Sequence, residues 1–90
     1  MTRVFSIFNK LGLHARPAAA FVNTAKKFAC DIVVQKDSEK VNGKSVIGLL
    51  LLAAGHGSQL TVHADGHDAS LALAELGTLF ERGFGEKGPQ

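Results

Sequence analysis

The sequence predicts an α+β domain in which three helices pack on one face of a four-stranded antiparallel sheet. Segments that alternate apolar and polar residues are typical of half-buried strands, and segments whose apolar residues recur every three or four positions are typical of amphipathic helices. The two kinds follow one another in the order β-α-β-β-α-β-α. Short, separated strands with three helices favour a layer of helices on an antiparallel sheet over a parallel α/β arrangement.

The chain opens with a strand and a helix. Residues 2–8 are rich in Val, Phe and Ile, and they predict a strand in which Phe5 and Ile7 share one face. From Pro17 onward, apolar side chains recur at helical spacing for about three turns, which predicts an amphipathic helix. Its apolar side chains are Ala18, Phe21, Val22, Ala25 and Phe28.

A strand pair and a short second helix are predicted next. Residues 31–35 indicate a strand, residues 36–39 a polar turn, and Lys40–Val41 a return strand ending at Asn42–Gly43. Residues 46–54 then predict a helix that begins after Ser45 as its N-cap and stops at Gly55. We expect Leu49 and Leu52 in the core, and a buried strand is the competing interpretation of this segment.

The last third of the chain predicts a strand and a helix. Residues 60–64 alternate apolar and polar side chains, and Asp65–Gly66 ends the strand as a turn. Asp68 or Ser70 can cap the helix that follows, whose apolar residues lie between Leu71 and Phe80. Glycines after residue 82 mark its end, and a short loose tail is expected from about residue 85.

Size and composition indicate one ordinary globular domain over residues 1–90. The chain has 46% hydrophobic and 20% charged residues, which is close to average usage. A net charge of +2 and the lack of Trp and Tyr argue against nucleic-acid binding. The single cysteine, Cys30, excludes an intrachain disulfide, and neither a secretory signal nor a membrane-spanning segment is present. We therefore expect a soluble cytoplasmic protein.

The clearest chemistry lies in the run Gly12-Leu13-His14-Ala15-Arg16-Pro17, where the first helix is expected to begin. A helix start presents unpaired N–H groups and the positive end of the helix dipole, so an anion is stabilised there. A neutral imidazole is a nucleophile near pH 7, and the Arg16 guanidinium could bind a phosphoryl group that His14 receives. The ring or its phosphate is then the expected helix cap. The spacing alone also allows a simpler interpretation, in which His14 only caps the helix and Arg16 is a solvated charge.

Two longer runs resemble a known family. Gly12-Leu13-His14-Ala15-Arg16-Pro17-Ala18-Ala19-Ala20-Phe21-Val22 resembles the active-site signature of HPr, the histidine-containing phosphocarrier family of the phosphoenolpyruvate-dependent phosphotransferase system. Asn42-Gly43-Lys44-Ser45-Val46-Ile47-Gly48-Leu49 resembles that family's regulatory serine region, and Phe84-Gly85-Glu86 resembles its C-terminal end. The resemblance covers essentially the whole chain. It implies an HPr-like open-faced β-sandwich, which agrees with the predicted element order.

The resemblance also implies roles for individual residues. His14 would accept a phosphoryl group from phospho-Enzyme I through Nδ1 and donate it to an Enzyme IIA domain, while Arg16 stabilises the phosphate. The protein would then be a monomeric carrier in sugar transport, without a cofactor, and not a free-standing enzyme. Ser45 matches the position that an HPr serine kinase/phosphorylase modifies in many family members. The residues expected to bind partners are Ala15, Ala19, Ile47, Gly48 and Leu50.

Two alternatives for the function stay open. One is the nitrogen-related branch of the same family, whose final acceptor regulates instead of transporting. The other is a regulatory binding module that acts by docking when Ser45 is phosphorylated, as in a family relative that lacks the active-site histidine. The presence of His14 favours the carrier. His56, His63 and His67 have no Cys, Asp or Glu that completes a metal site, so we expect surface histidines and no metal.

Overall fold

Four antiparallel strands and three helices make up the computed structural model, which describes residues 1–85. The strands are β1 (Thr2–Ser6), β2 (Asp31–Lys36), β3 (Glu39–Asn42) and β4 (Gln59–Asp65). The helices are α1 (Ala15–Ala25), α2 (Val46–Leu51) and α3 (Ala69–Glu81), and a 3-10 turn, η1 (Gly83–Gly85), follows the last one. The predicted α+β fold is confirmed, whereas the tail expected from about residue 85 lies, after Gly85, outside the described residues.

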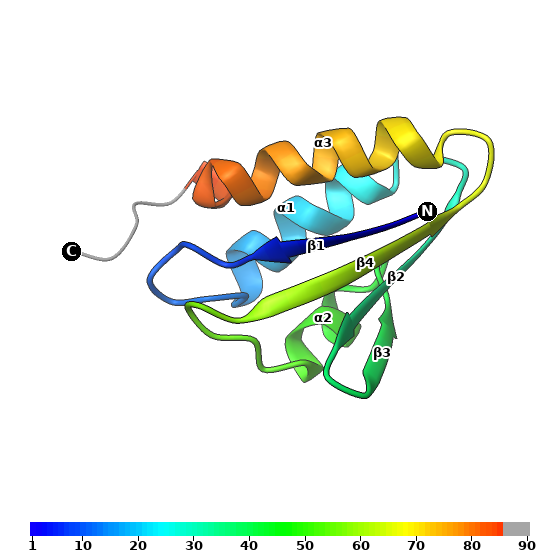
Figure 1. Ribbon diagram of the computed structural model, residues 1–90. Coiled ribbons are helices and arrows are strands. Elements are labelled where there is room, and N and C mark those ends of the chain that lie inside the picture. The colour runs from blue at the N-terminus through cyan, green and yellow to red at the C-terminus, as the bar shows by residue number, and fades with distance from the viewer. Residues whose placement is uncertain (86–90) are drawn as a thin grey trace.

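The sheet has the order β1-β4-β2-β3, and every neighbouring pair is antiparallel. Figure 1 shows β4 running through the middle of the sheet, with α1 and α3 stacked along one side of it. Side chains that face the helices are buried, and those that point the other way are more exposed. In β4, for instance, Leu60, Val62 and Ala64 are buried, while Thr61 and His63 lie on the open face.

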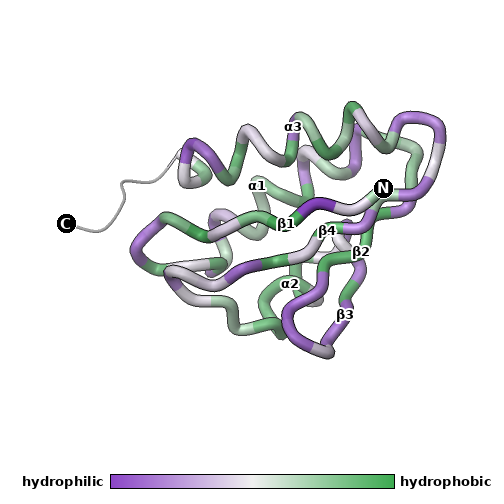
Figure 2. Tube along the Cα trace, in the orientation of Figure 1, coloured by the Kyte–Doolittle hydropathy of each residue, from purple (hydrophilic) through white to green (hydrophobic). Residues whose placement is uncertain are grey.

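Hydropathy along the chain follows the same two faces. Figure 2 shows hydrophobic residues recurring along α1 and α3, whereas the β2–β3 turn and the β4–α3 connection are hydrophilic. On the open face, His63 is hydrogen-bonded through Nδ1 to Thr2 Oγ1 at 3.0 Å and through Nε2 to Gln35 Oε1 at 2.9 Å. This histidine therefore joins three strands across the open face.

Aromatic rings join the helices to β1 in the core. Phe5 of β1 stacks on Phe80 of α3 with ring centroids 4.7 Å apart. Phe21 of α1 and Phe84 of η1 each meet the Phe80 ring edge-on, at 6.1 and 4.9 Å. Such pairs add to the free energy gained by burying the rings. Phe80 thus ties the first strand, the first helix and the last turn of the described chain together.

The helix boundaries differ from those predicted at three places, the first being that α1 ends at Ala25 although the prediction included Phe28. Helix α1 begins at Ala15, two residues before Pro17, so Arg16 lies inside the first turn. Pro17 is tolerated there because the N–H groups of a first helical turn have no intrahelical acceptor. Helix α2 stops at Leu51 instead of running to Gly55, because Ala53 adopts a left-handed conformation with a φ of 50°. The alternative of a buried strand for this segment is wrong.

The side chain of Asp68 makes other hydrogen bonds than the capping bond that the sequence predicts. It is the N-cap residue of α3, as expected, but its side chain makes no capping hydrogen bond to that helix. Its carboxylate instead accepts hydrogen bonds from the backbone N–H groups of Ala29 at 2.8 Å and Cys30 at 3.0 Å. These bonds lower the pKa of Asp68, while burial and the neighbouring Asp68 raise the pKa of the buried Cys30 thiol. The carboxylate thereby holds the α1–β2 and β4–α3 connections together.

Candidate functional site

His14 is the residue at which the chain turns into α1. Its backbone is extended, with φ −85° and ψ −171°, and its carbonyl accepts the first helical hydrogen bond from the Ala18 N–H at 3.0 Å. The side chain is half-buried. It makes no capping hydrogen bond to the helix backbone in the described chain, so the expectation that the ring itself caps α1 is wrong.

The first turn of α1 is electropositive. It contains no acidic residue, although Asp and Glu are the side chains that stabilise a helix at this end. It carries instead the exposed Arg16, whose positive charge is unfavourable beside the positive end of the helix dipole. This placement of Arg16 therefore does not stabilise the helix. The N–H groups of Ala15 and Arg16 point out of the same helix end.

The loop that precedes His14 lies tightly against the segment after α2. Gly12 has a φ of 71°, a conformation that favours glycine, and a Cβ added there would lie 2.5 Å from the Ala54 carbonyl oxygen and 2.6 Å from Gly55 Cα. The Leu13 N–H donates to the Ala54 carbonyl at 2.8 Å, and the Leu13 side chain is buried. The close approach therefore requires glycine at position 12, whereas a Cβ on Gly55 would meet no atom within 4 Å. Gly55 does not end α2, which stops at Leu51.

Asn9 also fixes this loop, and the sequence pattern that predicts a strand over residues 2–8 gave this residue no role. The side chain is fully buried, and both its backbone carbonyl and its amide bind Gly12. The available signal was the spacing, because an Asn three residues before a Gly is typical of a turn.

Ser45 is the N-cap of α2, as predicted. Its backbone is extended, and its Oγ accepts a hydrogen bond from the Gly48 N–H at 3.0 Å. The hydroxyl is half-buried, and the preceding Lys44 extends its ammonium group to the Phe28 carbonyl at 2.7 Å. The cap matters because a helix of six residues is too short to be stable by itself.

Helix α2 has one buried and one exposed apolar side. Leu49 and Leu52 are in the core, as predicted, with 0% and 4% of their surface exposed. Ile47 and Leu51 are 72% and 70% exposed, and Leu50 is partly exposed at 39%. Leu51 was not among the residues predicted to bind partners.

Helix α1 is a neighbour of α2. The two helices are in contact, and α1 contributes Ala15, which is exposed, and Ala19, which is half-buried like Gly48 of α2. We call the surface formed by Ala15, Ala19, Ile47, Gly48, Leu50 and Leu51 the apolar shoulder. Exposed large apolar side chains such as Ile47 and Leu51 are typical of protein interaction sites.

Comparison with known proteins places this geometry in a family. A family model described as the PTS HPr component phosphorylation site matches residues 1–82. The chain belongs to the HPr family. Phosphocarrier protein HPr of Neisseria meningitidis serogroup B is 44% identical over 80 residues, which cover 89% of this chain and 90% of that protein.

Solved structures of HPr proteins agree with the fold as well. A crystal structure of HPr from Thermoanaerobacter tengcongensis matches with a TM-score of 0.93 at 45% identity, covering 97% of this chain and 98% of that one. A crystal structure of Crh, a catabolite repression protein of Bacillus subtilis described as a dimer with a swapped domain, matches with a TM-score of 0.74 at 43% identity. That match covers 82% of this chain and 85% of Crh. The HPr-family relatives therefore include Crh, a protein named for catabolite repression.

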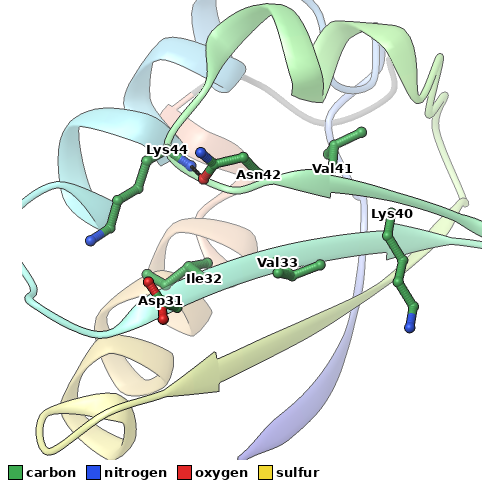
Figure 3. Close-up of a pocket in the computed structure, with 7 residues that line it drawn as sticks. All are labelled: Asp31, Ile32, Val33, Lys40, Val41, Asn42 and Lys44. Atoms are coloured by element: carbon green, nitrogen blue, oxygen red, sulfur yellow. Dashed lines mark hydrogen bonds between the residues drawn. The ribbon is translucent and has the colours of Figure 1, made fainter.

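A hollow of about 600 Å³ in this HPr-family chain lies away from His14. Figure 3 shows it between β2 and the end of β3, with Asp31 and Val33 on one side and Asn42 and Lys44 on the other. The Asn42 side-chain oxygen accepts a hydrogen bond from the Lys44 N–H at 2.9 Å, which closes the turn at its rim. Neither His14, Arg16 nor Ser45 lines this hollow.

Residues 1–85 of this HPr-family chain lack two other features. Within that range, no three His, Cys, Asp or Glu side chains come together as a metal ion would require. Over the same residues, no helix has the length and apolar character needed to cross a membrane.

Proposed function

We propose that this protein is a phosphocarrier of the phosphoenolpyruvate-dependent phosphotransferase system. His14 Nδ1 accepts a phosphoryl group from phospho-Enzyme I and donates it to an Enzyme IIA domain. In the first step the bond from Nδ1 to phosphorus forms as the donor's bond to phosphorus breaks. In the second step the bond from Nδ1 to phosphorus breaks as the acceptor's bond to phosphorus forms. The observation that carries the proposal is the half-buried His14 at the start of a helix whose first turn is cationic.

The helix start supplies what a phosphorylated imidazole needs. The phosphoryl group brings close to two negative charges, which the N–H groups of Ala15 and Arg16 and the Arg16 guanidinium can meet with charge-assisted hydrogen bonds. Phosphoryl transfer depends mainly on positioning and charge stabilisation, so the docked partners supply the remaining groups. The protein works as a cytoplasmic monomer without a metal or cofactor, and it releases no product of its own.

The apolar shoulder is the proposed docking surface for Enzyme I and Enzyme IIA. It combines exposed apolar side chains with the adjacent Arg16, so a partner with an apolar centre and an acidic rim would fit it. Ala15 and Ala19 contribute small side chains from α1, and Ile47, Gly48 and Leu50 extend the surface over α2. The nitrogen-related branch would use the same surface with a different final acceptor.

A second role is regulation at Ser45. Phosphorylation by an HPr serine kinase/phosphorylase would add up to two negative charges at the start of α2, where the helix dipole favours them. The same charge would lie beside the apolar shoulder and oppose acidic partners, so relay would slow. The cap position of Ser45 and the similarity to Crh favour this candidate, in which the protein also acts as a regulatory binding module.

Radiolabelled phosphoenolpyruvate and Enzyme I provide the test. We expect an acid-labile, base-stable phosphate on the protein that disappears in His14→Ala and persists in His56→Ala, a matched control at an exposed histidine. Arg16→Glu should slow labelling without lowering thermal stability, because an acidic residue is favourable in the first turn of a helix. Unchanged labelling of His14→Ala would refute the carrier function, and a kinase-dependent, acid-stable phosphate absent from Ser45→Ala would identify the regulatory role.

A further inference from the structure

We propose that Asn9 is the positioning residue that holds His14 in place for phosphoryl transfer, an inference that rests on the proposed function. Asn9 lies between β1 and α1, and its side chain has no exposed surface. Its backbone carbonyl accepts a hydrogen bond from the Gly12 N–H at 3.1 Å, and its Nδ2 donates to the Gly12 carbonyl at 2.5 Å. One residue therefore binds both polar groups of Gly12.

The second of these bonds satisfies a group that water reaches poorly. Gly12 is buried, so its carbonyl oxygen needs a hydrogen-bond donor inside the protein. Without the Asn9 amide, the carbonyl would have to move toward solvent to recover a hydrogen bond. Gly12 cannot retreat in the opposite direction, because the backbone of Ala54 and Gly55 already touches its other side.

The position of Gly12 is passed on to His14 through one residue. Leu13 is anchored by its buried side chain and by the hydrogen bond from its N–H to the Ala54 carbonyl. His14 then begins α1, where its carbonyl is bound by the Ala18 N–H. With the backbone fixed on both sides, the imidazole leaves the chain at a defined place relative to the first turn of α1. A shift of about 1 Å in such a group can slow a reaction about a hundredfold.

The back of Asn9 is covered by the end of the described chain. A Cβ added at Gly83 of η1 would lie 3.8 Å from Asn9 Cβ, which is ordinary contact. The side chain is thus enclosed between η1 and the loop of residues 10–13 and cannot contact a docked partner. Its effect on transfer must pass through the geometry of His14, which predicts a change in kcat and not in KM.

The test uses Asn9→Asp and Asn9→Ala, with Leu73→Ala as the control. Asp keeps the shape of Asn but replaces the donor with an acceptor opposite the Gly12 carbonyl, and Ala removes the group. Leu73 is buried in the first half of α3, so its truncation weakens the core without touching the loop. Rates are measured with the intact protein as substrate of Enzyme I, at a temperature where circular dichroism shows every variant folded.

We expect kcat to fall at least about tenfold for both Asn9 variants, with KM for the protein changed less than about twofold. Leu73→Ala should keep the wild-type kcat. Labelling of His14 by phosphoramidate, which needs no docking, should slow in parallel. If Asn9→Asp does not fold, Asn9→Ser, which keeps a hydroxyl donor, should fall between wild type and Asn9→Ala.

Three results would overturn the inference. Asn9 variants no slower than Leu73→Ala, or slowed through KM alone, would make Asn9 a merely structural residue. Phosphoramidate labelling of the Asn9 variants at the wild-type rate would do the same while leaving the carrier function intact. Failure of Enzyme I to label His14 in the unsubstituted protein would instead refute the proposed function, and this inference with it.

Discussion

Substitution of Ser45 separates its capping role from its proposed regulatory role. Ser45→Ala removes the acceptor of the Gly48 N–H, a hydrogen bond of 3.0 Å at the start of a six-residue helix. Loss of an N-cap side chain costs about 1 kcal/mol of stability. For a chain of this size, that corresponds to a fall in Tm of about 4–8 °C. Ser45→Asp keeps a capping acceptor and places a negative charge at the favourable end of the dipole, so its Tm should stay near wild type.

The order of the two variants should be reversed when the rate of phosphoryl transfer is measured. Ser45→Ala leaves the apolar shoulder uncharged and should transfer phosphoryl groups at the wild-type rate, whereas Ser45→Asp should slow transfer, and less so at high salt. Thermal unfolding followed by circular dichroism and transfer from Enzyme I measure the two effects independently. An unchanged Tm for Ser45→Ala would refute the capping energy. Equal relay rates for the two variants would refute the electrostatic argument.

Two further predictions concern the apolar shoulder and Asp68. Ile47→Ala should raise the KM for the protein in the Enzyme I reaction about fivefold, as for an interface contact worth about 1 kcal/mol, and should change Tm little. Leu49, in contrast, is 0% exposed, so Leu49→Ala should lower the free energy of unfolding in urea by about 2–5 kcal/mol. Because its two backbone hydrogen bonds lower the pKa of Asp68, its stabilising contribution is complete above its ordinary value of 3.8 and is lost as pH falls through the lower folded-state pKa. Asp68→Asn should therefore be less stable than wild type at pH 6 and should approach it at pH 2, and a constant difference between the two acid-unfolding curves would contradict this.

Local patterns were sufficient to predict the order of elements and the two faces of the sheet. Apolar alternation depends only on which side of a strand faces the core, so it located the buried residues of β4 correctly. Ser45 was predicted as a cap because an N-cap is defined by residues within three positions of it. The place of His14 at a helix start followed from local signals of the same kind.

Features that depend on distant partners could not be predicted in this way. Asp68 carries an ordinary capping signal, but it binds backbone groups 38 and 39 positions earlier in the chain. Gly55 is a good helix terminator by type, yet α2 has already ended at Leu51 and Ala53 makes the turn. The glycine that close packing requires is Gly12, whose contacts are with Ala54 and Gly55. Leu51 is as apolar as Leu49, and only the orientation of a short helix determines which of them faces solvent.

The pairing of β1 with β4 has a consequence for how the chain folds. Thr2 lies opposite His63 in this pair, so the two strands are joined across most of the sequence. Closing so long a loop is slow compared with forming helices or the β2–β3 hairpin. During synthesis the N-terminal strand has no partner until β4 has left the ribosome, and we expect its docking to be a late event. The loop that carries His14 directly follows this strand, so we expect the start of α1 to reach its final geometry only near the end of folding.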